Sequence, residues 1–345
     1  METILGPEAF NGREGHRGVS QRTQWNDQVV AMPCHAAGTS LAKSAREVCV
    51  YYQRTLKQAL GCSGIGLHSG KKVTLRLLPA PEDTGIVFRR VDQDGFEIPA
   101  HISYLQKVDF ATTLGAGGVQ IKTVEHLLGA FYGMGIDNAL VEINASEIPI
   151  MDGSAAPFIY LIREAGAVNQ ARARRYYKVS RPMEVQEADR WIRIVPSEDL
   201  RVSYTIDFRH PLIHQQTLTL PIHPSTFEDQ IAPARTFGFM KDVEALRVKG
   251  LALGGSVDNA VVLGESRALN PDLRFLNEFV RHKVLDVLGD LSLCGFHVKG
   301  HVMVHKGGHR LHAEMAKLLH ISRGMHAIES GPEDAAVLGL SPPLA

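Results

Sequence analysis

The sequence lacks the features that identify several common protein classes. It has only four cysteines (Cys34, Cys49, Cys62 and Cys294) and no C-x-x-C pair, which argues against a disulfide framework and against a cysteine-rich zinc site. It has no run of roughly eighteen apolar residues, so we expect no transmembrane segment. Lysine plus arginine equals aspartate plus glutamate at 37 each, so no net basic field attracts nucleic acid. Any metal site must therefore use histidine and carboxylate side chains.

Residues 1–50 differ in composition from the rest of the chain. They are rich in Gly, Ser, Gln and Arg and show no sustained periodicity, so we interpret them as a disordered leader. A transit peptide should contain few acids, yet five occur here (Glu2, Glu8, Glu14, Asp27 and Glu47). With the scattered cysteines, this favours a cytoplasmic location, and organelle targeting by the leader stays open as the alternative.

The remaining residues predict an α+β protein. Alternating apolar residues predict strands at 73–78, 85–90, 138–143, 176–187, 191–195 and 201–208. Helical periodicity predicts helices at 121–133, 157–165, 241–249, 273–288 and 311–320. The order strands, helix, strand, helix occurs twice, without a clear residue-level repeat.

We therefore expect two similar two-layer α+β sandwich domains that face each other, with the active site in the cleft between them. The predicted domains span residues 51–171 and 172–327, and the second carries a hydrophobic insert around 237–263. Residues 172–175 begin the second domain as a solvated basic linker, and residues 328–345 form a loose tail.

The helix predicted around residues 279–290 carries a row of polar side chains. Residues four apart share a helix face, so His282, Asp286 and Asp290 form one ridge. A neutral imidazole and a carboxylate one turn apart can bind a divalent metal, typically zinc. Asp290 is placed to orient another group. The alternative, a surface helix with a wet polar face, is weakened by Lys283 beside the ridge and by Gly289 within the helix.

A second motif, at residues 121–131, supplies a third ligand and a base. Thr123 is a plausible helix cap before an apolar run. Glu125 and His126 are adjacent, so their side chains point about 100° apart. His126 suits a metal ligand, while Glu125 suits the general base for a metal-bound water. The alternative is a capped amphipathic helix with a solvated Glu and His.

These motifs, with those between them, resemble the UDP-3-O-acyl-N-acetylglucosamine deacetylases of lipid A synthesis over roughly residues 52–325. The resemblance rests on segments 64–72 (GIGLHSGKK), 123–126 (TVEH), 147–154 (EIPIMDGS), 234–239 (ARTFGF), 254–256 (GGS), 281–283 (RHK, followed by Asp286 and Asp290) and 306–309 (KGGH). So many ordered motifs over most of a chain are specific.

The resemblance implies a zinc-dependent amide hydrolase, with ferrous iron as the alternative metal. The implied metal ligands are His126, His282 and Asp286. The implied catalytic residues are Glu125 as base, Thr236 as an oxyanion donor, and His309 held by Asp290. Either Glu125 or His309 protonates the leaving amine.

Substrate contacts are also implied by the resemblance. Lys283 suits a phosphate or sugar contact, and Phe237 begins the insert that forms a passage for the fatty acyl chain. The expected partner is therefore an acylated nucleotide sugar, without nucleic acid, and we expect a monomer.

Two other functions stay open at this stage. A nucleotide-sugar binding protein would need a closed structural metal site, in which Glu125 has no role. A zinc peptidase usually carries H-E-x-x-H, which is absent. His297, His301, His305 and His309 are spaced by four, but the surrounding Val and Gly residues favour a strand and a turn. We interpret the histidines of this segment other than His309, including His312, as surface or packing residues.

Overall fold

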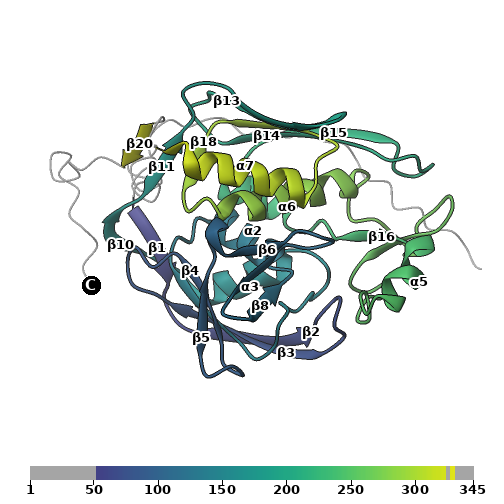
Figure 1. The fold of residues 1–345 in the computed structure, drawn as a ribbon, viewed down its shortest axis with the longest axis horizontal. Coiled ribbons are helices and arrows are strands. Elements are labelled where there is room, and N and C mark those ends of the chain that lie inside the picture. The colour runs from purple at the N-terminus through teal and green to yellow at the C-terminus, as the bar shows by residue number, and fades with distance from the viewer. Residues whose placement is uncertain (1–51, 324–326, 331–345) are drawn as a thin grey trace, which may run out of the picture. The chain divides into compact units, whose positions relative to one another are not determined.

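Two five-stranded sheets enclose a layer of helices in the computed structural model, which describes residues 52–323 and 327–330 (Figure 1). The first half contains strands β2 (Leu60–Ile65), β3 (Lys72–Pro79), β4 (Ile86–Arg90), β5 (Phe96–Pro99) and β9 (Ala139–Ile143), with helices α2 (Glu125–Met134) and α3 (Ala156–Ala165). The second half contains strands β12 (Met183–Glu187), β13 (Arg190–Val195), β14 (Arg201–Asp207), β15 (Gln215–Pro221) and β19 (His301–His305), with helices α6 (Glu278–Ser292) and α7 (His309–Ile321).

Smaller elements complete the two halves. The first half inserts η1 (Ile102–Tyr104), β6 (Leu105–Lys107), β7 (Thr113–Ala116) and β8 (Val119–Lys122) before α2. The second half inserts α4 (Pro224–Thr226), η2 (Phe227–Ile231), β16 (Phe237–Phe239), α5 (Met240–Val248) and β17 (Val261–Leu263) before α6. Strand β1 (Tyr52–Leu56) pairs with β10 (Ala167–Ala173), and β11 (Arg175–Lys178) lies between β18 (His297–Lys299) and β20 (Ala327–Ser330).

The two large sheets have the same topology. Their strand orders are β2-β3-β9-β4-β5 and β12-β13-β19-β14-β15. In each, the last strand in the chain lies in the middle, antiparallel to the second strand and parallel to the third. The predicted α+β class is confirmed, and the repeated order of strands and helices is present. The domain boundaries at 51–171 and 172–327 stay predictions.

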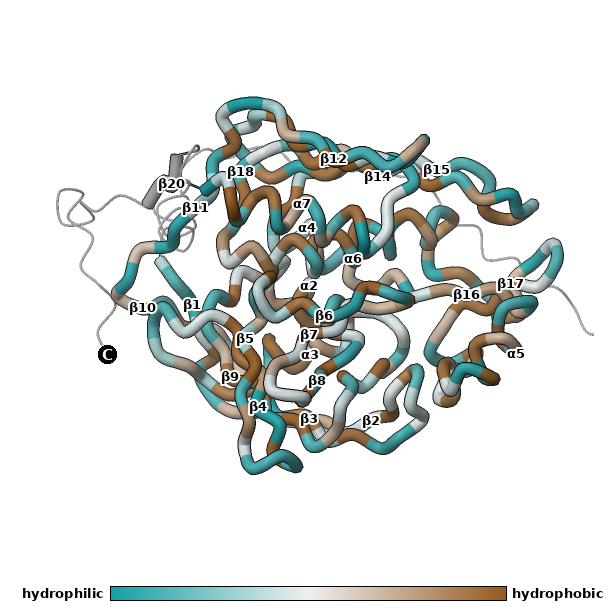
Figure 2. Tube along the Cα trace, viewed as in Figure 1, coloured by the Kyte–Doolittle hydropathy of each residue, from teal (hydrophilic) through white to brown (hydrophobic). Residues whose placement is uncertain are grey.

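Buried and exposed residues alternate along the strands, so each sheet packs one apolar face against the helices. Strand β3 buries Val73, Leu75 and Leu77, and β14 buries its alternate residues in the same way. Helices α2 and α6 are buried on most sides because they form the middle of the molecule. Hydrophobic positions accordingly gather in the helices and the inner strands, while many exposed turns are hydrophilic (Figure 2).

Helices α2 and α6 cross at two glycines. A Cβ at Gly289 would lie 2.1 Å from the backbone oxygen of Glu125, and a Cβ at Gly129 would lie 2.7 Å from Leu285 Cδ1. Only glycine permits so close an approach of the two backbones. This crossing brings the two predicted motifs together.

The structure corrects several predicted boundaries. The helix predicted from residue 121 begins at Glu125, because residues 119–122 pair with β7 as strand β8. Thr123 is not the helix cap, since it has a positive φ of 58° and its hydroxyl donates to Glu147. Helix α6 begins at Glu278 rather than residue 273, because the Glu278 carboxylate accepts from the Arg274 N–H and holds the preceding segment as a loop.

Further corrections concern residues 172–187 and the histidine series. The strand predicted at 176–187 is two strands, β11 and β12, separated around Pro182, which lacks an N–H. Arg174 is not solvated, since it is buried and forms a bidentate ion pair with Asp137 (2.8 and 2.6 Å). The predicted strand and turn at the histidine series are present as β18 and β19. The predicted leader, and the tail beyond residue 330, lie outside the described residues.

Candidate active site at the crossing of α2 and α6

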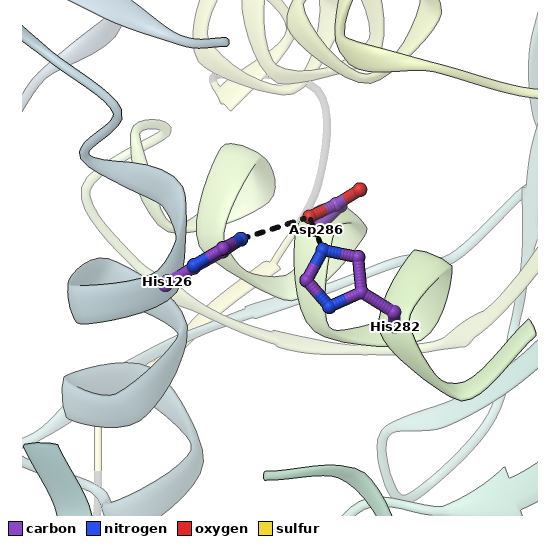
Figure 3. Close-up of side chains that lie close together, drawn as sticks. All are labelled: His126, His282 and Asp286. Atoms are coloured by element: carbon purple, nitrogen blue, oxygen red, sulfur yellow. Dashed lines mark ion pairs between the residues drawn. The ribbon is translucent and has the colours of Figure 1, made fainter. Parts of the chain in front are cut away.

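Three side chains from the two crossing helices converge on one point. His126 comes from α2, and His282 and Asp286 come from α6 (Figure 3). Asp286 Oδ1 lies 3.3 Å from His282 Nε2 and 3.8 Å from His126 Nε2. One ligand atom of each residue lies within 4.8 Å of the others. The structure thus brings together the three metal ligands predicted from the sequence.

The chemistry of this group fits a divalent metal. Tetrahedral zinc with bonds of about 2 Å places neighbouring ligand atoms roughly 3.3 Å apart, which is close to the observed separations. Burial lowers the pKa of His126 to about 3 and also lowers the pKa of His282, so both rings are neutral and carry a free lone pair. Burial opposes ionisation of Asp286, but Lys283 and the histidines outweigh it and hold the pKa well below its usual range.

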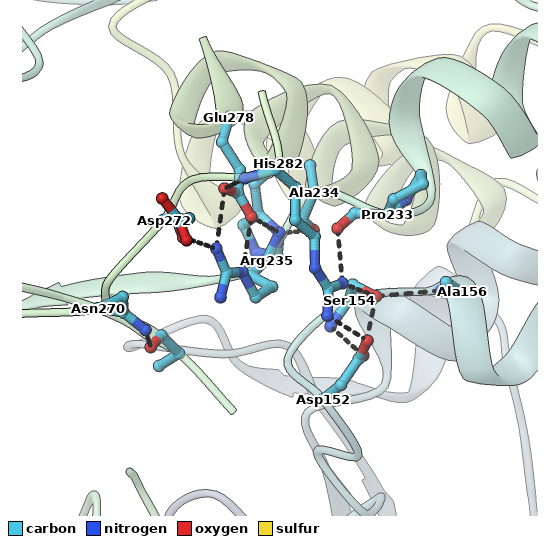
Figure 4. Close-up of polar contacts among 12 residues, drawn as sticks. Asp152, Ser154, Ala156, Pro233, Ala234, Arg235, Asn270, Asp272, Glu278 and His282 are labelled. Carbon is cyan, nitrogen blue, oxygen red and sulfur yellow. Dashed lines mark hydrogen bonds and ion pairs between the residues drawn. The ribbon is translucent and has the colours of Figure 1, made fainter. Parts of the chain in front are cut away.

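A backbone carbonyl fixes the orientation of His282. Its Nδ1–H donates to Ala234 O (3.0 Å), which leaves Nε2 as the lone pair facing Asp286. Glu278, one turn earlier on α6, is fully buried and accepts from the backbone N–H and the guanidinium of Arg235 (2.9 and 2.8 Å). The loop that supplies the carbonyl is therefore pinned to the same helix as the histidine it orients (Figure 4).

Glu125 lies at the first position of α2, beside the ligand His126. Its Oε2 accepts from the Thr112 N–H (3.1 Å), and its Oε1 lies 3.9 Å from His309 Nε2. Burial raises the pKa of Glu125 to about 7. A carboxylate with a pKa near neutrality suits proton transfer better than metal binding.

A second group of side chains lies next to Glu125. Asp290 Oδ2 accepts from Nδ1–H of both His309 and His312 (2.8 Å each). Burial opposes the charge of Asp290, but these histidines lower its pKa to about 2. An ionised carboxylate only accepts hydrogen bonds, so both Nδ1 atoms carry protons and have no free lone pair. The arrangement is a hydrogen-bond network rather than a second metal site.

His309 is the group in this network that carries a charge. Burial alone lowers its pKa, but the carboxylates of Asp290, Glu125 and Asp286 outweigh burial and raise the pKa to about 9. His309 is therefore an imidazolium at neutral pH, with Nε2–H on the side of Glu125. The expectation that Asp290 orients another group agrees with this contact.

Comparison with known proteins bears on this arrangement of metal ligands, buried glutamate and imidazolium. Residues 53–320 match the LpxC family model, described as UDP-3-O-acyl N-acetylglycosamine deacetylase. The chain belongs to this family.

Curated relatives agree with this assignment. A UDP-3-O-acyl-N-acetylglucosamine deacetylase of Oleidesulfovibrio alaskensis is 46% identical over 301 residues, which is 83% of this chain and 99% of the relative. Relatives with the same description from Idiomarina loihiensis and Saccharophagus degradans are 47% and 49% identical. They cover 77% and 75% of this chain, and 89% and 87% of their own lengths. The resemblance predicted from the motifs is confirmed.

The deacetylase motif around Thr236 lies beside the candidate metal ligand His282 and borders a cavity. Phe237 packs edge-on at 6.5 Å from the His282 ring and at 5.1 Å from Phe279. Thr236 and Phe237 line a cavity of about 450 Å³ enclosed largely by residues 236–262, with Leu67, His68 and Phe110 opposite. Thr236 is fixed by its backbone N–H, which donates to Gly153 O (2.8 Å). The cavity lies within the hydrophobic insert predicted around 237–263.

Lys283 is not freely solvated, because its ammonium group forms an ion pair with the candidate metal ligand Asp286. Its Nζ is 2.7 Å from Asp286 Oδ2, the oxygen that does not face the histidines, and 5.8 Å from the Phe237 ring centre. Its charge therefore offsets that of the ligand carboxylate. The predicted contacts of Lys283, Phe237 and Thr236 with substrate stay predictions.

Glu147 holds the glycine-rich turn of the deacetylase motifs in place. Its carboxylate accepts from the backbone N–H groups of His68 and Ser69 (2.7 and 2.8 Å) and from Thr123. The turn follows β2 and closes with Gly66 N–H donating to Lys71 O. Residues 66–71 therefore form a tight turn.

Sequence reasoning did not identify three residues that the structure places in the site. Thr112 donates to both Glu125 and Asp290, Tyr204 donates to His312, and His312 donates to Asp290. His312 is buried, which fits a packing residue, but its hydrogen bonds to Asp290 and Tyr204 also make it part of the site. Its spacing of three from His309, on one helix, was the available signal.

A larger cavity of about 890 Å³, lined by Tyr132, Arg174 and His297 among others, contains none of the candidate site residues. Among the described residues, no helix combines the length and the apolar character needed to cross a membrane.

Proposed function

We propose that this chain hydrolyses the N-acetyl group of UDP-3-O-acyl-N-acetylglucosamine and releases acetate, the deacetylation step of lipid A biosynthesis. Membership of the deacetylase family supports this activity. The observation that carries it is the arrangement of Glu125 and His309 on one side of the converging ligands His126, His282 and Asp286. Acetyl transfer to water needs an electrophile activator, a base and an acid, and this arrangement offers all three.

We infer that the three converging ligands hold zinc, with ferrous iron as the alternative. A metal bound there supplies Lewis acidity, polarising the acetyl carbonyl and lowering the pKa of water. The hydrogen bond from His282 Nδ1–H to Ala234 O leaves His282 Nε2 free to bind the metal. Lys283 binds Oδ2 of Asp286, so Oδ1 is the oxygen available to the metal. The protein thus fixes these donors in advance, which reduces the ordering cost of binding.

Glu125 acts as the general base in this proposal. The Thr112 N–H holds one of its oxygens, so the other is directed into the site. As the attacking water forms its bond to the acetyl carbon, Glu125 accepts the water proton. Positioned bases of this kind typically contribute about 10²–10⁴ in rate.

His309 supplies positive charge and the proton for the leaving amine. Its Nε2 lies 3.9 Å from Glu125 Oε1, and we infer that the imidazolium stabilises the negative charge that develops on the carbonyl oxygen. When the C–N bond breaks, the amine needs one proton, which His309 Nε2–H or protonated Glu125 donates. The Thr236 hydroxyl is retained as a further donor to the oxyanion.

We infer that the cavity behind Phe237 receives the fatty acyl chain of the substrate. Its walls include the rings of Phe237, Phe239 and Phe110 and the side chains of Val243 and Leu246, which suit an alkyl chain. Lys283 lies between this cavity and the metal ligands, where a sugar or phosphate oxygen would meet its ammonium group. A monomer and a cytoplasmic location remain expectations from the sequence.

Glu125→Gln separates this activity from simple binding. The variant keeps the size and hydrogen-bonding capacity of the side chain but cannot accept the water proton. We expect acetate release to fall about 10²–10⁴-fold, with metal stoichiometry and affinity for the nucleotide sugar little changed. Near-normal turnover would remove Glu125 as the base. If the wild-type protein binds metal and nucleotide sugar but releases no acetate, it is a binding protein instead.

A further inference from the structure

The carboxylate of Asp290 accepts three hydrogen bonds in the interior of the protein. Oδ1 accepts from the Thr112 hydroxyl (2.5 Å), and Oδ2 accepts from Nδ1–H of both His309 and His312 (2.8 Å each). Asp290 itself is only 1% exposed. Of the three donors, only His309 is described above as part of the reaction, so His312 needs its own explanation.

His312 is held in one tautomer by its second partner. Its Nδ1 donates to a carboxylate, so the Nε2 of the neutral ring is an acceptor, and the Tyr204 hydroxyl lies 3.0 Å from it. Both side chains are fully buried. Burial lowers the pKa of His312 and raises that of Tyr204 well above its usual range. The Tyr204 hydroxyl therefore donates to the neutral ring of His312.

A chain of hydrogen bonds thus runs from the second sheet to His309, with the Asp290 carboxylate as the acceptor shared by His312 and His309. It begins at Tyr204 on β14, passes through His312 on α7 to Asp290 on α6, and ends at His309. Each member occupies a rigid element rather than a loop. Such chains fix the orientation of the last group, as second partners fix the ligands of a metal.

We propose that His312, oriented by Tyr204, is a positioning residue of the deacetylase reaction, which fixes the Asp290 carboxylate so that His309 Nε2–H faces Glu125. The proposal rests on the proposed function. With two donors on Oδ2 and one on Oδ1, the carboxylate has a single orientation. Without His312, Oδ2 keeps only His309, and the pair can rotate about the Asp290 side chain.

His312 also tempers the basicity of His309. The ring of His309 faces Asp290, Asp286 and His282 from α6, Glu125 and His126 from α2, and His312 from its own helix. Asp290 makes the strongest charge contact among these. A donor on the same oxygen offsets part of the carboxylate charge, so its loss makes the imidazolium hold its proton more tightly.

Three replacements of His312 in the full metal-loaded chain test this role. His312→Phe removes the donor and keeps the ring volume. His312→Asn places an amide N–H near the position of Nδ1, and His312→Gln places its amide near Nε2, out of reach of Asp290. We expect His312→Phe and His312→Gln to lower kcat by about 10-fold or more, with KM and metal stoichiometry unchanged. His312→Asn should recover most of kcat.

The pH dependence gives a readout that loss of packing alone would not change. We expect the alkaline limb of kcat to move upward by up to about one pH unit in His312→Phe, since a hydrogen bond to a charged group is lost. The limb should stay near the wild-type position in His312→Asn. Tyr204→Phe should act in the same direction and more weakly. Tyr177→Phe is the control, because it removes an equally buried hydroxyl that bonds Ser322 outside the site.

Titration of His309 by NMR, with labelled histidine, separates this proposal from the proposed function. Equal kcat and equal alkaline limbs in the Asn and Gln variants would overturn the positioning role, even if His312→Phe fails to fold. An unchanged pKa of His309 in both Gln and Phe variants would also overturn it. If the pKa moves as expected but wild-type protein releases no acetate, only the proposed function fails.

Discussion

Replacing Gly289 by alanine tests whether the crossing of α2 and α6 sets the geometry of the metal ligands. A Cβ at residue 289 would lie 2.1 Å from the backbone oxygen of Glu125, 2.8 Å from its carbonyl carbon and 3.0 Å from its Cα. Ordinary contacts of a Cβ begin at 3.4 Å. The helices must therefore part by about 1 Å, because backbone atoms cannot rotate away as a side chain can.

We expect Gly289→Ala to change the geometry of the site more than the stability of the fold. Overpacking costs about 1–3 kcal/mol, and the better helix propensity of alanine offsets about 1 kcal/mol of this. His126 follows Glu125, and Asp286 lies one turn before Gly289, so parting the helices separates ligands from the two halves. A misplacement of about 1 Å typically costs roughly 100-fold in rate. We expect a folded protein with weaker metal binding and kcat/KM roughly 100-fold lower.

Gly129→Ala is the matched control for this prediction. Its Cβ would meet Leu285 Cδ1 at 2.7 Å, and the nearest backbone atom, Leu285 O, at 3.3 Å. The leucine can change rotamer, so we expect a loss of less than about 10-fold. The measurements are metal affinity, acetate release and Tm for both variants. Wild-type metal affinity and turnover in Gly289→Ala, or an equal loss in Gly129→Ala, would refute the reasoning.

Two further predictions concern the ligands and the imidazolium. Replacing His126, His282 or Asp286 by alanine should lower bound metal and acetate release in parallel, and full metal stoichiometry in all three variants would remove the proposed site. Activity that needs protonated His309 should be retained below about pH 9 and lost as the pH rises through the raised pKa of His309. Asp290→Asn should move that alkaline limb of the pH–rate profile to lower pH, and an unchanged limb would show that another group titrates there.

Sequence reasoning predicted those parts of the site whose residues share one helix. The spacing of His282, Asp286 and Asp290 placed all three on one side of a helix, and α6 carries them. Each step of four residues on a helix turns by about 40° beyond a full circle, so the ridge diverges. As a result, Asp286 faces His126 while Asp290 faces His309. Periodicity alone therefore predicted the helix but not the division of labour between the two carboxylates.

The residues that sequence reasoning missed owe their role to distant contacts. Thr112 is 178 positions from Asp290 in the chain, and Tyr204 is 108 positions from His312. Neither belongs to a recognisable local pattern. The prediction for Thr123 failed although it rested on a local pattern. The Thr123 hydroxyl donates to Glu147 instead of capping the helix, and the Thr123 backbone has a positive φ. Local propensity is a weak guide wherever a buried carboxylate offers a stronger partner.

The crossing of the two helices also reveals an internal repeat. An offset of 160 residues takes Val124, Leu128, Gly129 and Gly135 to Val284, Leu288, Gly289 and Gly295. Gly135 and Gly295 both have positive φ, of 67° and 84°, after their helices. Because the matching sheets have one topology, these identities mark α2 and α6 as equivalent elements. The repeat is too sparse to find without knowing that the two helices correspond.

The same offset explains why the site forms where it does. It converts the contact of Gly129 with Leu285 into the contact of Gly289 with Glu125, so the two close approaches are equivalent contacts related by the repeat. This is the relation that an approximate two-fold axis imposes. The offset also takes His126 to Asp286, so two of the proposed metal ligands occupy equivalent positions on either side of that axis. The halves also differ at the neighbouring position, where Leu285 is apolar and Glu125 is the proposed base. An approximate symmetry thus accounts for the meeting of side chains from both halves, and the proposed base lies at a position where the two halves differ.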